Sequence, residues 1–463
     1  MESPCEGAHN FRLVITRRNA MEILLLTQGS QWALPRVAIP PRKRVAEQLI
    51  AEARRGWGLE AHCLFVLRRS SDSQEGKGKC AVLESERHND RSTAGTHWVP
   101  RVAAAGSLGV SEAQLVRESL EELDGYIRDE TTGPFAKPGW LRELFRWTGE
   151  QVTPLGFRLT GGFRQLNASP AFSLIRLETE GGAVWFKATG EPNAHELQLT
   201  LALSQLFPGS VPRILGVHGR WNGWLSEDAS GDLLAQITEF PAWARAAEAL
   251  AELEIASIGK TAELLEAQAK DLRIPQLNRR IDPFLARMGE LMAVQDKPTP
   301  APLAASELQT LAEGLKEACA LLEELALPDT LGHMDSNPGN IVAGSDRCVF
   351  LDWAEGCVAY PFLTIEYLRE HLKRSRVQEP AAGERLMSAY LRPWESFFSP
   401  EHLRRAQAVS PLVAAFAYAV AGDSWRSPDL LENLQLAGYF RSLTRRMHRE
   451  SVQVALRSER CLS

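Results

Sequence analysis

The sequence predicts an α+β fold in which a small antiparallel sheet precedes a large helical region. Two observations in the middle and the second half of the chain predict it. Runs at 154–160, 172–178 and 183–188 are typical of three strands, and the turn "ETEGG" joins the last two as a hairpin. Beyond residue 229 the apolar residues recur at helical spacing, for example along one face of 308–325.

A third observation predicts a separate α/β segment at the N-terminus. Residues 11–16 and 22–26 are typical of strands, and the helix that follows ends near Gly58. The polar segment 71–94 predicts an irregular surface loop, and 111–127 has the apolar spacing of a helix. The next residues, "RDETTGPFAKPGW", combine charge with glycine and proline and are typical of a linker. We therefore expect an N-terminal domain at 1–127, a linker and connecting helix at 128–151, a small β lobe at 152–228 and a helical lobe at 229–463.

Composition narrows the class of protein. A hydrophobic content of 44% and a charged content of 24% match an ordinary globular protein, and the net charge of -6 argues against binding to nucleic acid or to an anionic membrane. The seven cysteines are scattered without a C-x-x-C pair, which indicates a reducing compartment. The longest apolar run, 411–422, is too short to cross a bilayer. We expect a cytoplasmic protein, and its oligomeric state stays open.

The stretch "GHMDSNPGNIVAGSDRCVFLDW" places polar residues at both edges of an apolar hairpin. If Asp346 lies at the tip of the hairpin, Asn340 and Asp352 face each other across the ladder, with Cα atoms about 4.5–5.5 Å apart. An amide oxygen opposite a carboxylate suits Mg²⁺, which leaves its other positions to water and phosphates. Asp335 lies just upstream, where its carboxylate could act as the base for an acceptor hydroxyl.

Each of these residues alone has an ordinary structural explanation. Asn340 could cap a turn, Asp352 could end a strand, and His333 could be a hydrogen-bonded core histidine. The joint spacing, H-x-D-x-x-x-x-N followed by an aspartate after a short hairpin, is much rarer than its parts. The combination therefore favours a phosphate-handling site.

These motifs resemble the catalytic machinery of kinase-like phosphotransferases. His333, Asp335 and Asn340 match their catalytic loop, and Asp352 matches their second metal-binding residue. "HMDSNPGN" and "DWAE" are similar to the aminoglycoside phosphotransferase and choline kinase branch, whose members phosphorylate small hydroxylated molecules. The resemblance implies a bilobal protein-kinase-like fold that uses ATP (or GTP) and Mg²⁺. It implies that Asp335 is catalytic, that Asn340 and Asp352 bind the metal, and that His333 is structural.

The resemblance also implies a lysine on the third strand of the small lobe and a glutamate on the next helix that orients it. Lys187 ends the third predicted strand, and Glu196 lies on a helix predicted at 194–207. Glu191 is an alternative partner for the lysine. A solvated lysine at a strand end would be the ordinary explanation of Lys187.

Three further residues complete the expected nucleotide site. Gly161 and Gly162, in the segment 159–167 that we place between the first two strands, could lie over the phosphates, although a plain turn is an equal alternative. Glu227 lies in "GWLSEDASGDLL", which resembles the hinge where backbone groups meet the adenine, although a loop between domains explains it as well. 

The chain also departs from the family pattern. It lacks G-x-G-x-x-G and A-P-E, which disfavours a protein substrate. Where aminoglycoside phosphotransferases often carry P-x-x-D-L-A, it reads "YPFLTIEYL", with Glu366 as a structural substitute. The resemblance covers about residues 152–400.

The N-terminal segment "WALPRVAIPPRKRVAEQLIAEARRGWGL" resembles the start of a Nudix domain. In that alignment Arg55 and Gly56 occupy the positions of the two metal-binding glutamates, and only Glu52 keeps its place. A basic helix repels the Mg²⁺ that Nudix chemistry needs, so we expect a degenerate Nudix-like domain without hydrolase activity. The helix could bind an anion or dock onto the kinase-like domain, but a solvated charged face is the simpler explanation.

Together these observations predict a small-molecule kinase that transfers the γ-phosphoryl group of ATP to a hydroxyl. A nucleotide-binding regulatory protein, coupled to the inactive Nudix-like domain, is the main alternative, and a Nudix-type hydrolase is the other. An acidic acceptor pocket would favour polycationic acceptors such as aminoglycosides, but the sequence does not identify the acceptor.

Overall fold

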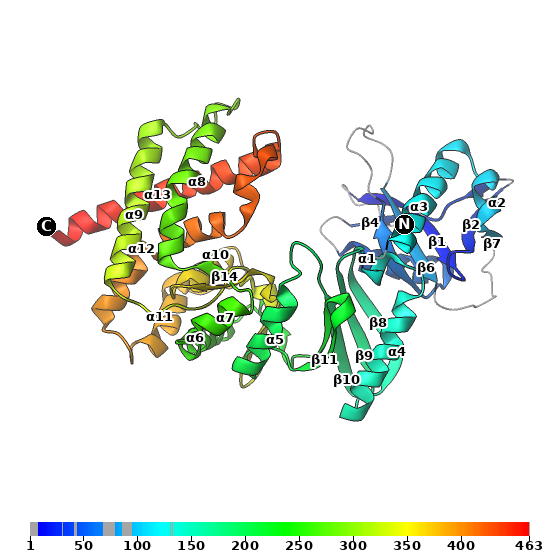
Figure 1. Ribbon diagram of the computed structural model, residues 1–463, viewed down its shortest axis with the longest axis horizontal. Coiled ribbons are helices and arrows are strands. Elements are labelled where there is room, and N and C mark those ends of the chain that lie inside the picture. The colour runs from blue at the N-terminus through cyan, green and yellow to red at the C-terminus, as the bar shows by residue number, and fades with distance from the viewer. Residues whose placement is uncertain are drawn as a thin grey trace. The chain divides into compact units, whose positions relative to one another are not determined.

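The computed structural model describes residues 8–29, 31–40, 44–67, 79–85, 95–129, 131 and 133–462 (Figure 1). The chain forms two compact units, of which unit 1 comprises Met1–Leu197 and Arg213–Asp228, and unit 2 comprises Gln198–Pro212 and Ala229–Ser463. The chain crosses between the units after Leu197, after Pro212 and after Asp228, so residues 198–212 of the small lobe expected at 152–228 belong to unit 2. The predicted boundary at residue 127 does not separate two compact units, because both sides of it lie in unit 1.

The first part of unit 1 is a mixed seven-stranded sheet. Its main path runs β3-β2-β1-β6-β5, with β4 beside β1 and β7 beside β2. The strands β1 and β6 are parallel, and the other pairs are antiparallel. The strands are β1 (His9–Arg17), β2 (Glu22–Gln28), β3 (Gln31–Ala33), β4 (Arg36–Ile39), β5 (Ala61–Val66), β6 (Lys79–Ser85) and β7 (Thr96–Pro100).

Strand β6 corrects the prediction of a surface loop at 71–94. Its residues from Cys80 to Ser85 are buried beside β1 and β5, as expected of a strand inside a sheet. Polar stretches on both sides hide this short apolar run in the sequence. Residues 71–78 and 86–94 of the predicted loop lie outside the described residues.

The helices of this part follow the sequence pattern. Helix α1 (Val45–Trp57) buries one face and ends where Gly58 adopts φ +64°, a conformation that glycine takes at little cost. A short helix, α2 (Arg101–Ala104), precedes α3 (Val110–Arg128), which confirms the helix predicted at 111–127. The N-terminal segment is therefore α/β, as predicted.

A five-stranded antiparallel sheet completes unit 1, in the order β11-β12-β10-β9-β8. The helix α4 (Trp140–Val152) packs along it (Figure 1). The strands are β8 (Leu159–Ala168), β9 (Ser173–Thr179), β10 (Gly182–Ala188), β11 (Ile214–His218) and β12 (Gly223–Glu227).

The first of these strands lies later in the chain than predicted. Residues Thr153–Leu155 form a 3-10 turn that begins beside a proline, and β8 starts only at Leu159. The segment 159–167, which we expected between two strands, is therefore itself a strand. The predictions for β9 and β10 are confirmed.

Unit 2 is mainly helical and contains two short sheets. One sheet has the order β13-β16-β17 and the other β14-β18-β15. The strands are β13 (Asp232–Leu233), β14 (Lys270–Leu272), β15 (Thr330–His333), β16 (Ile341–Ala343), β17 (Cys348–Phe350) and β18 (Gly356–Ala359). Both sheets lie in the middle of the unit, where they support the loop that carries Asp335.

The helices of unit 2 confirm the helical pattern seen beyond residue 229. Helices α8, α9 and α13 pack against one another (Figure 1). In the part of the chain that the structure describes, no helix combines the length and the apolar character needed to span a bilayer. The helices are α5 (Glu196–Leu206, which begins in unit 1), α6 (Phe240–Ala256), α7 (Thr261–Glu266), α8 (Ile274–Ala293), α9 (Ala305–Glu324), α10 (Leu363–Leu372), α11 (Ala382–Trp394), α12 (Pro400–Val420) and α13 (Leu434–Leu462).

The two sheets of unit 1 share one hydrophobic core. Apolar side chains of the N-terminal sheet, of α4 and of the five-stranded sheet pack in a single cluster, whose buried members include Val14, Leu64, Val82, Trp140, Leu144, Ile175 and Phe186. Burying apolar surface between two sheets is the main source of stability for such a contact. The N-terminal domain is therefore an integral part of the small lobe and not a separate unit tied on by a linker.

A buried glutamine connects the two sheets by hydrogen bonds. Gln165 on β8 is only 1% exposed. Its Oε1 accepts a hydrogen bond from the backbone N–H of Cys63 at 2.8 Å, and its Nε2 donates to the carbonyl of the same residue at 2.9 Å. Nearby, Arg164 of β8 forms an ion pair with Glu47 of α1 at 2.5 Å. The side-chain amide of Gln165 thus pairs with β5 as a neighbouring strand would.

The Gln165 contact predicts a stability effect. In Gln165→Ala the buried N–H and C=O of Cys63 lose this partner, so we expect the free energy of unfolding of unit 1 to fall by about 2–4 kcal/mol. Denaturant unfolding followed by tryptophan fluorescence measures the change. The control is Gln114→Ala, which removes a hydrogen bond to Glu118 on the exposed face of α3. Equal and small effects of the two substitutions would contradict the role of Gln165.

Candidate functional site

The predicted catalytic loop of unit 2 runs between the two short sheets. It begins at the end of β15, where His333 is buried, and enters β16 through a 3-10 turn at Pro338–Asn340. The side chain of Asn337 caps this turn by accepting a hydrogen bond from the N–H of Gly339 at 2.8 Å. The sheets therefore fix both ends of a short polar loop that contains Asp335.

Three side chains donate hydrogen bonds to Asp335, which is half-buried. The Nδ2 of Asn340 donates to Oδ2 at 3.0 Å and to the Asp335 carbonyl at 2.9 Å. The Nδ2 of Asn337 donates to Oδ1 at 3.0 Å, and the hydroxyl of Tyr367 donates to the same oxygen at 3.4 Å. The structure thus brings Asp335 and Asn340 together and holds the carboxylate in one orientation.

His333 connects the loop to the hairpin. The backbone N–H of Asp335 donates to its Nδ1 at 3.2 Å, so Nε2 carries the ring proton that is donated to the carbonyl of Leu351 at 2.8 Å. Its own N–H donates to Thr364 Oγ1 at 3.0 Å. These contacts of a buried histidine are those of a structural residue.

The register of the hairpin differs by one residue from the prediction. Ile341 pairs with Phe350, and the N–H of Leu351 donates to the carbonyl of Asn340 at 2.8 Å, so Leu351 and not Asp352 lies opposite Asn340. The loop of the hairpin contains four residues, Gly344 to Arg347, which moves the tip away from Asp346. A shift of one residue changes the face on which a strand residue lies.

Asp352 leaves the ladder in an unusual backbone conformation. Its φ of +63° and ψ of +69° lie in the left-handed region, which few residues other than glycine adopt. Such a conformation re-aims the side chain after the strand, and it is often kept at functional sites despite its cost. The chain holds Asp352 in this way immediately before the buried Trp353.

Asn340 and Asp352 offer oxygen atoms of the type that Mg²⁺ prefers. Both hydrogens of the Asn340 amide group are directed toward Asp335, which leaves Oδ1 as the atom that this side chain presents to a cation. An amide oxygen and a carboxylate fit a hard cation that keeps several waters. Among the described residues, no three His, Cys, Asp or Glu side chains gather into a metal-binding group.

In unit 1, Lys187 and Glu196 form the expected ion pair. Lys187 lies near the end of β10 and Glu196 is the first residue of α5. The Nζ of Lys187 contacts Oε1 of Glu196, and the two side chains are 12% and 1% exposed. The alternative partner, Glu191, is exposed. The lysine is therefore a fixed, largely buried cation and not a solvated strand end.

The structure does not bring Gly161 and Gly162 to Lys187. Lys187 pairs with Leu174 near the turn between β8 and β9, whereas the glycines lie at the other end of β8, near Thr179. The aromatic rings of Phe172 and Trp224 lie beside Lys187, with centroids 6.0 and 5.7 Å from Nζ. The turn at 169–172 takes the place beside the lysine that we expected the glycines to hold. Within β8, Gly161 adopts φ +85° at an irregularity in the pairing with β9.

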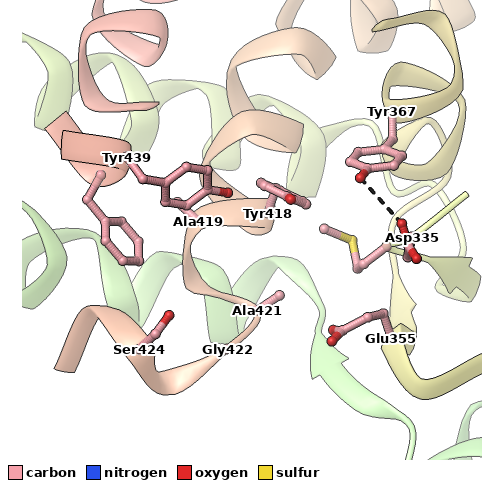
Figure 2. Close-up of a pocket in the computed structure, with 11 residues that line it drawn as sticks. Asp335, Glu355, Tyr367, Tyr418, Ala419, Ala421, Gly422, Ser424 and Tyr439 are labelled. Atoms are coloured by element: carbon pink, nitrogen blue, oxygen red, sulfur yellow. Dashed lines mark hydrogen bonds between the residues drawn. The ribbon is translucent and has the colours of Figure 1, made fainter. Parts of the chain in front are cut away.

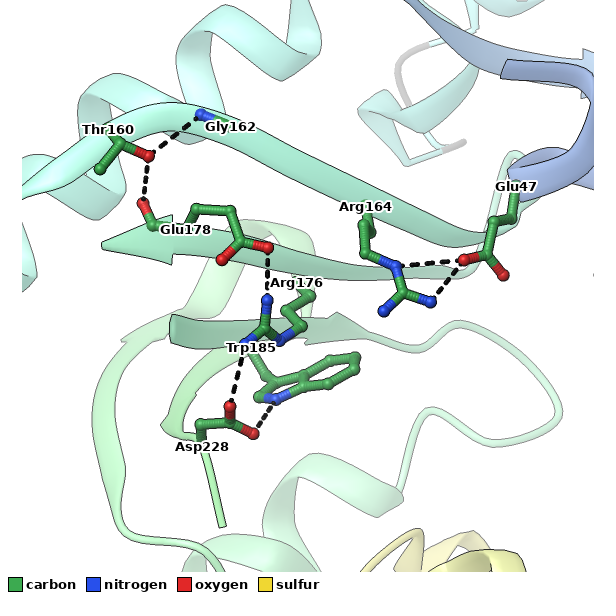
Figure 3. Close-up of polar contacts among 8 residues, drawn as sticks. All are labelled: Glu47, Thr160, Gly162, Arg164, Arg176, Glu178, Trp185 and Asp228. Atoms are coloured by element: carbon green, nitrogen blue, oxygen red, sulfur yellow. Dashed lines mark hydrogen bonds and ion pairs between the residues drawn. The ribbon is translucent and has the colours of Figure 1, made fainter. Parts of the chain in front are cut away.

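A polar cluster lies on the small-lobe sheet around Asp228 (Figure 3). The carboxylate of Asp228 accepts a hydrogen bond from Trp185 Nε1 at 2.7 Å and pairs with Arg176 at 3.3 Å. Arg176 also contacts Glu178. Glu227, the predicted hinge residue, ends β12 and lies 3.9 Å from Arg213. The contacts of Glu227 are those of a surface residue, whereas its neighbour Asp228 is anchored by two side chains.

A cavity of about 310 Å³ opens beside Asp335 (Figure 2). Asp335 and Glu355 line it together with Tyr367 of α10, Tyr418 of α12 and Tyr439 of α13. Burial, with the nearby Tyr418 and Asp335, raises the pKa of Tyr367 well above its usual value, so its hydroxyl keeps its proton. Glu355 is paired with Lys270. Sequence reasoning missed the tyrosines, because they lie on three helices that only tertiary packing brings together.

Two buried carboxyl groups lie behind the site. Glu366, the suggested structural substitute, pairs with Arg369 at 2.6 Å, and burial raises its pKa to about 7. Glu254 on α6 accepts a hydrogen bond from the hydroxyl of Tyr390. Burial raises the pKa of Glu254 to about 8, although hydrogen bonds with Tyr390 and Thr364 act in the opposite direction.

Comparisons with known proteins were made at three levels. The chain matches no protein-family model and no curated protein. A choline kinase from Cryptosporidium parvum aligns with a TM-score of 0.45 at 12% identity, over 69% of this chain and 94% of that one. An ethanolamine kinase from Plasmodium vivax aligns with a TM-score of 0.43 at 15% identity, over 67% of this chain and 87% of that one. A macrolide 2′-phosphotransferase from Brachybacterium faecium aligns with a TM-score of 0.42 at 14% identity, over 65% of this chain and 98% of that one.

The environment of Glu254 predicts a dependence of stability on pH. Its pKa is raised from 4.5 to about 8 on folding, so the folded chain binds this proton more tightly than the unfolded chain. The stabilisation is complete below pH 4.5 and is lost as the pH rises to about 8. Glu254→Gln stays neutral, and we expect its thermal midpoint relative to wild type to rise across this range.

Thermal unfolding at several pH values checks this prediction. Glu252→Gln on the exposed face of the same helix is the control, and its difference from wild type should not follow the same rise. A constant difference for Glu254→Gln across the range would show that Glu254 is ionised in the folded protein.

Proposed function

We propose that this protein is a phosphotransferase that moves the γ-phosphoryl group of a nucleoside triphosphate, ATP or GTP, to a hydroxyl of a small molecule. One observation carries the proposal: the side chain of Asn340 holds Asp335 in place, in a loop that leads directly into the hairpin before Asp352. A fixed carboxylate for the acceptor hydroxyl, with an amide oxygen and a second carboxylate available as hard ligands on the same hairpin, is the set of groups that phosphoryl transfer to a hydroxyl uses.

Asp335 is the residue that orients and deprotonates the acceptor hydroxyl. A carboxylate fixed by three donors and lining a cavity can orient a hydroxyl and accept its proton. In the reaction the acceptor oxygen bonds to the γ-phosphorus, the bond to the β-phosphate oxygen breaks, and the hydroxyl proton passes to Asp335. The nucleoside diphosphate leaves.

Asn340 and Asp352 are the residues that would hold Mg²⁺, and Lys187 is the residue that would bind the phosphates. A bound Mg²⁺ would neutralise charge on the phosphate oxygens. Glu196 holds the ammonium group of Lys187 in a fixed position through their ion pair. Burying this pair would be costly without a further role, since desolvation offsets much of the attraction.

The cavity beside Asp335 favours a hydroxylated acceptor that also carries a cation. Two carboxylates, Asp335 and Glu355, line the cavity with three tyrosine rings, and only Glu355 has a lysine partner. Carboxylates and aromatic faces attract ammonium groups. Amino alcohols and aminoglycosides have this chemistry.

The main competing proposal is a nucleotide-binding regulatory protein. The shared core of unit 1 favours it, because nucleotide binding beside Lys187 would act on a sheet that is fused to the N-terminal sheet. A Nudix-type hydrolase is less consistent with the contacts, because Glu52, the one box carboxylate that remains, forms an ion pair with Arg55 at 2.5 Å. We propose that the N-terminal domain is a degenerate Nudix-like domain with a structural role.

Release of ADP in the presence of Mg·ATP and a panel of hydroxylated amines tests the proposal. We expect Asp335→Asn to lower kcat by about 10²–10⁴-fold, because the hydroxyl loses its base. Asp346→Asn, in the exposed loop of the same hairpin, should retain activity. Lys187→Met should raise the KM for ATP and lower kcat, whereas Lys260→Met on the surface should do neither.

The outcomes separate the three candidates. Nucleotide binding without ADP release for any acceptor would favour the regulatory protein. Nucleoside-diphosphate cleavage that survives Lys187→Met but is lost in Glu52→Gln would favour the hydrolase.

A further inference from the structure

A second cavity, of about 460 Å³, lies in unit 2 between the end of α10 and α13. We call it the basic cavity. Its charged lining residues are Lys373, Arg374, Arg446 and Arg449, together with Glu370 and Glu450. Four cations against two carboxylates leave a surplus of two positive charges. None of these residues belongs to the predicted catalytic machinery.

A third cavity lies between the basic cavity and the cavity beside Asp335, since it shares lining residues with both. This third cavity, of about 200 Å³, shares Met334, Tyr367 and Tyr418 with the Asp335 cavity, and it shares Arg374 and Arg446 with the basic cavity. Tyr439 lines all three. Figure 2 shows Tyr439, Tyr418 and Tyr367 in sequence toward Asp335. The three cavities therefore adjoin one another, and we call them together the groove: Asp335 lines the first cavity, and Arg374 and Arg446 line the other two.

The contacts of Glu370 show that the positive charge is not locally balanced. This one carboxylate pairs with Lys373 at 2.5 Å, with Arg446 at 3.3 Å and with Arg374 at 3.8 Å. Burial raises its pKa, but the hydrogen bond from Lys373 and the charges of Arg446, Lys373 and Arg374 lower it overall, so Glu370 is ionised. A single negative charge cannot neutralise three cations.

Arg446, like Arg374, is placed to meet a ligand in either cavity. Its side chain is 27% exposed and lines both the connecting cavity and the basic cavity. A guanidinium group presents several donors in one plane and binds carboxylates and phosphates through paired hydrogen bonds. In a partly buried groove such contacts are less screened than on an open surface.

From this charge separation we infer that the acceptor is bipolar, with its hydroxyl at Asp335 and an anionic group, a carboxylate or a phosphate, held by Arg446 and Arg374. This inference rests on the proposed function and narrows its substrate class. An acceptor with cationic groups alone would meet like charges at the far end of the groove, which costs affinity. The acceptor is therefore an elongated hydroxylated molecule with an acidic end.

A matched set of probes tests the inference. Each probe is an amino alcohol joined through a chain of one to six carbons to a terminal carboxylate, a terminal phosphate or a neutral carboxamide. Calorimetry measures binding to the full chain, and ADP release is recorded separately. For at least one chain length we expect an anionic probe to bind about tenfold more tightly than its carboxamide. The preferred terminus distinguishes a carboxylate from a phosphate.

The variants assign the effect to the basic cavity. In the double variant Arg374→Gln and Arg446→Gln the preference should fall to less than about twofold, and Arg446→Lys should retain part of it. The control is Arg405→Gln, which removes a surface cation of α12 that pairs with Glu324. Equal binding of anionic and neutral probes at every length, or the absence of binding by any of them, would overturn the inference. A preference for anionic probes without ADP release would instead overturn the proposed phosphotransfer.

Discussion

The candidate site depends on the amide group of Asn340. Its Nδ2 donates to the carboxylate and to the carbonyl of Asp335, so one side chain fixes both the backbone and the carboxylate of Asp335. Because these bonds use the amide hydrogens, the amide oxygen is the atom presented to a metal ion. The orientation of the Asp335 carboxylate and the atom that Asn340 leaves available for a cation therefore follow from one interaction. Asn337 and Tyr367 hold the other carboxylate oxygen, so the Asp335 side chain is fixed at both of its oxygens.

Buried polar groups support this loop from behind. His333 binds the N–H of Asp335 and the carbonyl of Leu351, and Thr364 binds the N–H of His333. Glu254 follows as a partner of Thr364 and Tyr390. Buried polar groups that have no contact with water must form hydrogen bonds with one another. Burying this hydrogen-bond network costs free energy of desolvation, but the network has few alternative arrangements. These hydrogen bonds fix the loop that carries Asp335 relative to α6 and α10.

The parts of the site that the sequence predicts correctly are local in the chain. The spacing of His333, Asp335 and Asn340 is set within one loop, and Lys187 and Glu196 lie on consecutive elements. The register of the hairpin was wrong by one residue because it depends on a four-residue loop and on backbone angles that a pattern of apolar residues does not encode. Strand β6 was missed because it is short and lies between polar stretches. The tyrosines of the groove could not be predicted, since α10, α12 and α13 meet only in the folded chain.

The basic helix α1 of the N-terminal domain is another element whose contacts depend on the folded structure. Its charge predicts either a solvated face or a surface that docks on the small lobe, and the contacts of α1 decide between them. Arg54 and Arg55 pair with Glu60 and Glu52, so these cations are balanced within their own domain. The acidic Glu47 forms the link to Arg164 of β8. The contact between α1 and β8 thus uses the acidic Glu47 and not the basic residues of the helix, and the apolar core that the two sheets share adds to the attachment of the domain. Through these contacts the N-terminal domain supports the sheet that carries Lys187.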